Sequence, residues 1–202
     1  MAENPFPTRA GRVPAPPGAT PGAAEAPEPT KAPEPTRPTT EPLRLRPALP
    51  ADLDFLRAML REAFNWNPDR APIPAERLAA DPTFARYLDG WPGPAECGVV
   101  AEAAGEPVGA TWLRLLPPDG AGYGFVAADV PELTLGVRPD WRGRGVGRAL
   151  LEELAEQARA AGLRAISLSV ERENRPAHGL YRSVGFRVVG GDEAADTMLR
   201  EL

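Results

Sequence analysis

The sequence predicts an α/β (α+β) domain that follows a proline-rich N-terminal tail. Residues 133–170 show an apolar strand, a glycine-rich turn, an amphipathic helix and a second strand, which is the pattern of a βαβ unit with parallel strands. Residues 98–103 and 108–115 alternate like two strands joined through Gly105, which is typical of an antiparallel hairpin. A mixed sheet flanked by helices is therefore expected.

The tail differs in composition from the rest of the chain. Twelve of the 26 prolines fall within the first 42 residues, where large apolar side chains are nearly absent and the run Ala-Pro-Glu-Pro-Thr occurs twice in succession. Such a segment buries too little apolar surface to offset the entropy of ordering it. We therefore expect a disordered spacer at 1–41 and a folded domain at 42–202. A peptide ligand for an aromatic groove is the alternative for the tail.

Hydrophobic periodicity places the elements of the domain. We expect a strand at 43–46, a helix at about 50–64, and a weaker helical stretch at 74–88 that is interrupted at Pro82. The amphipathic helix after the glycine-rich turn buries Val146, Leu150, Leu154 and Ala158 and ends at Gly162. The remaining elements are strands at 98–103, 108–115, 133–137, 165–170, 186–189 and 197–201 and a helix at 174–184.

A loop with three alternating glycines joins the strand at 133–137 to the helix that follows it. Glycine lacks the Cβ that would keep a ligand from the backbone, and it tolerates a positive φ. The amides of the loop and of the first helical turn can therefore point at one anion, with the positive end of the helix dipole behind them. The candidate phosphate-binding residues are Arg142, Gly143, Arg144, Gly145, Val146, Gly147 and Arg148.

Two other phosphate-binding loops do not fit these residues. A P-loop needs Gly-Lys-Ser/Thr, but Gly147 is followed by Arg148 and Ala149. A dinucleotide fingerprint that starts at Gly143 would need its third glycine at 148, and Glu171 lies too far along the chain for the ribose-binding acid. A nucleotide-binding oxidoreductase and a glycine turn without a ligand stay as alternatives.

A second motif follows the strand at 165–170. Asn174 and Tyr181 are seven residues apart, which is about two helical turns, so they share one face of the predicted helix. One elongated ligand would require this arrangement. The alternative is a helix with an asparagine N-cap and a tyrosine in the core.

Together the two motifs resemble the GNAT superfamily of acyl-CoA N-acyltransferases. The spacing Arg142-x-x-Gly145-x-Gly147 resembles the pyrophosphate loop of that family, and Asn-x-x-Ala-x-x-Leu-Tyr at 174–181, followed by Gly-Phe, resembles its second signature. The resemblance covers about 42–202. It implies a GNAT fold, with a mostly antiparallel sheet whose central parallel strand pair splays apart.

The resemblance also implies an activity, in which acetyl-CoA donates its acetyl group to a primary amine by direct attack in a ternary complex. The pantetheine arm would contact the backbone of Leu135 and Val137 and the side chain of Asn174. Tyr181 would protonate the departing thiolate. Since an amine of pKa near 10 must lose a proton before attack, Glu132 is the candidate base; the alternative is a solvated acid at the end of the strand.

Other side chains are weaker candidates. His178 lies one turn from both Asn174 and Tyr181 and is a second candidate base, although a lone helical histidine is more often exposed or packed. In the family, the acceptor pocket is built from the early helices and from the loop before the motif strand. The aromatic residues there, which are either pocket or core, are Trp66, Trp91, Tyr123 and Phe125.

Composition limits the partners and the compartment. The net charge is −5 and acids are interspersed among the arginines, so we expect no nucleic-acid partner. No signal peptide or membrane span is evident, and the single cysteine, Cys97, fits a reducing compartment, so we expect a cytoplasmic protein. One Cys and one His argue against a structural zinc site, and no metal is expected.

Several properties remain open in the sequence. The acceptor is an amine-bearing small molecule or peptide: a protein N-terminus, a lysine, an aminoglycoside, a polyamine or an amino acid. A homodimer is one of the oligomeric states considered. A non-catalytic acyl-CoA-binding module is the alternative function, although the presence of Tyr181 argues against it.

Overall fold

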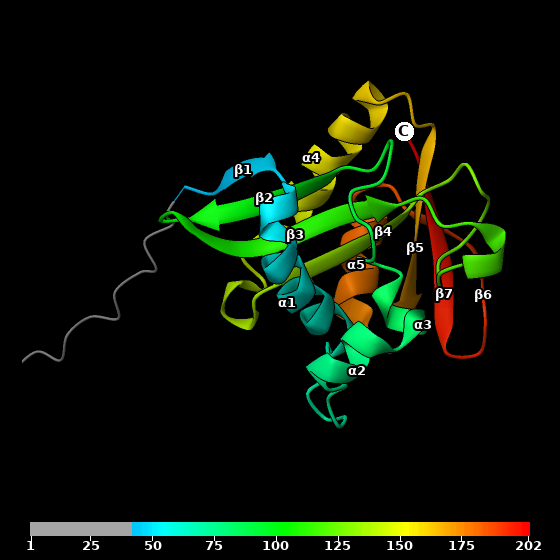
Figure 1. Ribbon diagram of the computed structural model, residues 1–202, viewed down its shortest axis with the longest axis horizontal. Helices are drawn as coiled ribbons and strands as arrows, with labels where there is room; N and C mark the ends of the chain where they lie inside the picture. The colour runs from blue at the N-terminus through cyan, green and yellow to red at the C-terminus, as the bar shows by residue number, and fades with distance from the viewer. Residues whose placement is uncertain (1–41) are drawn as a thin grey trace, which may run out of the picture. The chain divides into compact units, whose positions relative to one another are not determined.

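The computed structural model describes residues 42–202. The expected disorder of residues 1–41 lies outside the described residues, and the domain boundary stays a prediction. Within 42–202, one seven-stranded sheet has the order β1-β2-β3-β4-β5-β7-β6 (Figure 1). Its strands are β1 (Arg44–Pro47), β2 (Gly98–Ala103), β3 (Glu106–Arg114), β4 (Glu132–Val137), β5 (Ala165–Glu171), β6 (Arg187–Gly191) and β7 (Ala195–Glu201).

The helices agree with the predicted positions, with one difference. The stretch expected at 74–88 forms two short helices, because Pro82 begins a new one and Asp81 caps it by accepting a hydrogen bond from the Thr83 amide (2.9 Å). No helix among the described residues has the length and apolar character needed to cross a membrane. The α-helices are α1 (Leu53–Phe64), α2 (Ala75–Ala80), α3 (Pro82–Ala85), α4 (Val146–Ala160) and α5 (Arg175–Ser183).

The sheet is antiparallel except between β4 and β5, where the strands run parallel and share a single register pair, Glu132 with Ser167. Beyond this pair the two strands diverge. Figure 1 shows that β2, β3 and β4 run in a different direction from β5 and β7. The expected splayed parallel pair is therefore confirmed, and it divides the sheet into two halves.

Helices cover both faces of the sheet. On one face, α1 and the segment at 84–91 pack on Val100, Ala110 and Trp112. On the other face, α4 and α5 pack on the side chains that alternate with these along the strands, such as Val99 and Leu113. Both faces are thus covered by helices. The gap where β4 and β5 diverge therefore has side chains of one layer on each side.

Gly136 in β4 has a packing role that the sequence did not reveal. A Cβ at Gly136 would overlap the backbone carbonyl oxygen of Met59. Helix α1 therefore lies directly against β4 at this point.

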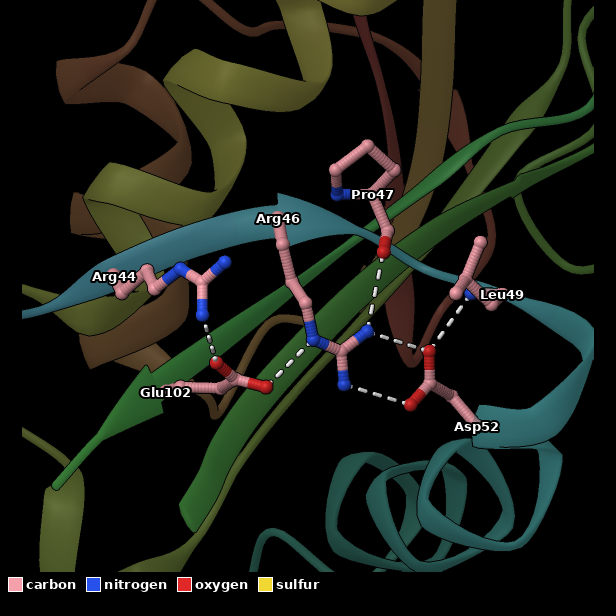
Figure 2. Close-up of polar contacts among 6 residues, drawn as sticks. All are labelled: Arg44, Arg46, Pro47, Leu49, Asp52 and Glu102. Carbon is pink, nitrogen blue, oxygen red and sulfur yellow. Dashed lines mark hydrogen bonds and ion pairs between the residues drawn. The ribbon is translucent and has the colours of Figure 1, made fainter. Parts of the chain in front are cut away.

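A polar cluster fixes the start of α1 (Figure 2). The guanidinium of Arg46 on β1 donates both Nη groups to the carboxylate of Asp52 (2.7 and 2.8 Å) and Nε to Glu102 on β2 (2.6 Å). The same Asp52 accepts a hydrogen bond from the Leu49 amide (2.8 Å). These bonds hold the chain that leads into α1 against the first two strands of the sheet.

Candidate active site

The gap between β4 and β5 leaves backbone groups of β4 without a partner on β5. The Pro131 carbonyl accepts a hydrogen bond from the Ser167 amide of β5 (2.9 Å), whereas the Thr134 carbonyl accepts one from the Thr111 hydroxyl of β3 (2.8 Å). Because backbone groups alternate in direction along a strand, those of Leu135 and Val137 point toward β5. The strands have diverged at that point, so these groups face the gap, as a pantetheine arm would require.

A cavity of about 600 Å³ lies at this gap. It is lined from one face of the sheet by Tyr87 and Glu132 and from the other by Asn174 and Tyr181. The splay therefore brings together residues from both faces. Leu135 also lines the cavity, whereas the Val137 carbonyl accepts a hydrogen bond from Arg142 Nε (3.2 Å) and lies outside the lining.

Glu132 is a buried acid, with 4% of its surface exposed, so the alternative of a solvated acid at the strand end is wrong. Its Oε1 accepts hydrogen bonds from the Tyr87 hydroxyl and the Gly124 amide, both at 2.9 Å. Its Oε2 has no hydrogen-bond partner and lies against Gly122, where a Cβ would overlap it. Burial raises the pKa of Glu132, and the two hydrogen bonds oppose this rise.

Asn174 and Tyr181 share the cavity face of α5, as predicted from their spacing. Asn174 is the N-cap, since its Oδ1 accepts a hydrogen bond from the Ala177 amide (3.2 Å), and its Nδ2 group remains able to donate to a ligand. Tyr181 packs edge-on against Phe186, with ring centroids 5.7 Å apart. Burial raises the pKa of Tyr181 to about 12, so its hydroxyl stays protonated at neutral pH.

Of the weaker candidates from the sequence, some line the cavity and others lie in the core. His178 is buried, its Nε2 lies 3.7 Å from Asp196 Oδ2, and it does not belong to the cavity lining. Trp91 is a core residue beside α1. Trp66 and Tyr123 line the cavity, and Arg70 stacks on the Trp66 ring at 5.5 Å.

Arg70 was not identified from the sequence. Its guanidinium donates to Glu171 (2.6 Å) and to Glu173 (2.7 Å), which lie 101 and 103 residues further along the chain. All three residues line the cavity. These exposed ion pairs therefore connect the segment after α1 with the end of β5 and the residues that follow it.

The glycine loop provides an open backbone surface. Gly143 and Gly145 have positive φ values of 72° and 83°, and nothing lies within 4 Å of a Cβ built on either of them. Gly145 is also the N-cap of α4. Gly147 differs because it lies inside α4, where a Cβ would approach Leu180 to 3.0 Å. Two glycines therefore open the loop, and the third allows α4 to pack closely against α5.

The basic residues of the loop contact the protein itself. Arg142 Nη2 donates to Glu62 of α1 (3.0 Å), Arg144 stacks on Trp141 (5.0 Å), and Arg148 donates to the Ser183 hydroxyl at the end of α5 (2.8 Å). Val146 is buried in the core, so only its backbone is available to a ligand. An anion at this loop would be held mainly by backbone amides, with exposed guanidinium groups nearby.

Comparison with known protein families agrees with this geometry. Residues 55–186 match the family model described as the Acetyltransferase (GNAT) family. The chain belongs to the GNAT family of acetyltransferases. The resemblance seen in the two sequence motifs is therefore confirmed.

Solved GNAT structures have the same fold. The PaiA N-acetyltransferase from Thermoplasma acidophilum, in complex with coenzyme A, is 20% identical and has a TM-score of 0.59, covering 80% of this chain and 99% of its own. A ribosomal-protein-alanine N-acetyltransferase from Brucella melitensis is 27% identical with a TM-score of 0.56, covering 79% of this chain and 99% of its own.

Curated relatives are longer than this chain. A mycothiol acetyltransferase from Propionibacterium freudenreichii subsp. shermanii is 36% identical over 156 residues, which is 75% of this chain and 45% of the relative. A mycothiol acetyltransferase from Saccharomonospora viridis is 30% identical over 75% of this chain and 48% of its own length. The chain thus spans less than half the length of these relatives.

Proposed function

We propose that this domain transfers an acetyl group from acetyl-CoA to a primary amine. The observation that carries the proposal is the cavity at the β4–β5 gap, which joins a buried carboxylate with a protonated tyrosine hydroxyl beside unpaired strand backbone. Family membership favours acyl transfer over a nucleotide-binding oxidoreductase.

The residues present fit acetyl-CoA. The open glycines Gly143 and Gly145 would hold the pyrophosphate through backbone amides, and the unpaired backbone at Leu135 would hydrogen-bond the pantetheine arm. Asn174 would donate its Nδ2 group to the same arm. When bound, acetyl-CoA supplies an activated thioester carbonyl.

Two side chains move protons in this proposal. Glu132 accepts a proton from the acceptor ammonium, directly or through a water, and leaves a neutral amine that can attack. Tyr181 donates its hydroxyl proton toward the departing sulfur. The two side chains come from opposite faces of the sheet and line the same cavity. Glu132 can therefore act on the amine while Tyr181 acts on the sulfur.

The acceptor is proposed only as an amine-bearing small molecule or peptide. One relative is named for mycothiol and one neighbour for alanine of a ribosomal protein, and the acceptors in these names differ in size and chemistry. The single cysteine, which is a free thiol, supports the cytoplasm as the proposed compartment.

The proposed function predicts that free thiol is released from acetyl-CoA when the right amine is present. The full chain would be incubated with acetyl-CoA and a panel of polyamines, amino acids, aminoglycosides and peptides with free N-termini. A colorimetric thiol assay would measure the release of free CoA. Release that depends on one amine class would support the proposal. Tight acetyl-CoA binding without acetylation of any amine would favour the acyl-CoA-binding module instead.

Gly145→Val is expected to raise the Kd for CoA at least about tenfold, which is ~1.4 kcal/mol, because the new side chain would cover the open amides and strain a positive φ. Isothermal titration calorimetry measures the change. Gly162→Val is the matched control, since Gly162 has a φ of 79° with open space around it but follows the C-terminal end of α4. Equal CoA affinities for the two variants would contradict the assignment of the loop.

A further inference from the structure

Tyr87 is a buried residue outside every motif of the sequence. It follows α3 and is 3% exposed. Its backbone carbonyl accepts a hydrogen bond from Trp112 Nε1 (2.8 Å), and its ring packs edge-on against Phe64, with centroids 5.8 Å apart. The backbone and the ring of Tyr87 are therefore each held by a contact, and its hydroxyl has a defined position in the cavity wall.

The hydrogen bonds of the Tyr87 hydroxyl have a fixed direction. The hydroxyl oxygen accepts from the Tyr123 amide (2.9 Å) and lies 2.9 Å from Glu132 Oε1. Since an amide N–H can only donate, the single hydroxyl proton must point to Glu132. Oε1 also accepts from the Gly124 amide, so both donors are on one carboxylate oxygen and none is on Oε2.

The 122–124 segment closes over this carboxylate. Gly122 lies against Oε2, and a Cβ at Gly124 would overlap the backbone of Leu168 on β5. Tyr87 binds this segment through the Tyr123 amide and binds Glu132 through its proton. One hydroxyl thus connects the covering segment to the acid.

We propose that Tyr87 is a positioning residue for acetyl transfer: its hydroxyl holds Oε1 of Glu132 and the covering segment in place, and so keeps the carboxylate at the cavity lining. The inference rests on the proposed role of Glu132. It adds a residue that acts through the Glu132 carboxylate.

Other charged groups around Glu132 are already engaged. The positive charge of Arg86 lowers the pKa of Glu132, and its Nη1 donates to the Ala121 carbonyl. Arg114, the register partner on β3, lies 3.1 Å from Glu96 and donates to the Asp89 carbonyl. Tyr181 on α5 stays protonated, and Arg70 pairs with Glu171 and Glu173 at the lining. The other charged lining residues are Arg172, Asp192 and Glu193.

Tyr87→Phe tests the proposal, because it keeps the ring and removes the donor. The ionised carboxylate loses a hydrogen bond, so the pKa of Glu132 should rise by about one unit. The carboxyl carbon resonance of Glu132, followed by NMR across pH, measures this directly. The acid limb of the kcat/KM profile should move to higher pH by the same amount. Below the wild-type pKa of Glu132, kcat/KM of the variant should be about tenfold lower than that of the wild type, and at high pH the two values should agree.

Tyr123→Phe is the matched control, since Tyr123 joins the network through its backbone amide, and it should leave the Glu132 titration unchanged. Tyr87→Met removes the same hydroxyl with a side chain of different shape, and it serves as a second, independent variant. An unchanged Glu132 titration in either Tyr87 variant would overturn the proposal. A shifted titration with an unchanged kcat/KM profile would keep the hydrogen bond but overturn Glu132 as the base, and with it the positioning role in catalysis.

Discussion

Glu132→Gln is expected to lower kcat/KM by about 10²-fold or more at neutral pH, since general-base assistance typically contributes 10² to 10⁴-fold. Glutamine keeps the volume of the side chain, and its carbonyl oxygen can still accept from Tyr87 and Gly124, so the site should stay folded. The amide cannot accept the acceptor proton. Steady-state kinetics with acetyl-CoA and the active amine measures the loss.

The pH profile separates this role from a loss of packing. Burial raises the pKa of Glu132, and a base must be ionised, so wild-type kcat/KM should rise with pH through that raised pKa. Glu132→Gln should lack this limb and keep the limb that belongs to the acceptor amine. A variant that keeps both limbs and wild-type turnover would exclude Glu132 as the base.

The motif-bearing half of the domain was accessible from the sequence because its signals are local. The strand at β4, the loop, α4 and β5 follow one another within 132–171, and each has its own periodicity or turn residues. The shared face of Asn174 and Tyr181 likewise follows from helical spacing alone. Short-range geometry of this kind needs no knowledge of the tertiary fold.

The environment of Glu132 was not accessible, since it depends on contacts between distant segments. Tyr87 lies 45 residues before Glu132, and nothing in the intervening sequence indicates that they meet. An acid at the start of a strand is usually solvated, and here Tyr87, Gly122 and Gly124 together cover the carboxylate.

The glycines show the same limit. Gly143 and Gly147 occupy equivalent positions in an alternating pattern, but one has a positive φ and open space while the other packs against Leu180. Gly136 accommodates Met59 of α1 rather than a ligand. A glycine pattern thus predicts that another group lies close to the backbone. Whether that group is a ligand or a neighbouring helix depends on the tertiary fold.

Tyr181→Phe is expected to lower kcat with little change in acetyl-CoA affinity, because it removes a proton donor from the cavity and keeps the ring that packs on Phe186. A thiolate is a moderately good leaving group, so we expect a loss near the lower end of the range for general-acid assistance, about 10²-fold. Calorimetry with acetyl-CoA and turnover assays with the same preparation separate binding from chemistry.

A tyrosine with only a packing role would give a different result. Loss of a buried hydroxyl hydrogen bond costs on the order of 1 kcal/mol in the free energy of unfolding, and turnover by the folded fraction would be unchanged. The melting temperature therefore provides the control: a lower Tm with wild-type kcat would assign Tyr181 to the core. Wild-type turnover in a folded Tyr181→Phe variant would point instead to proton delivery by water.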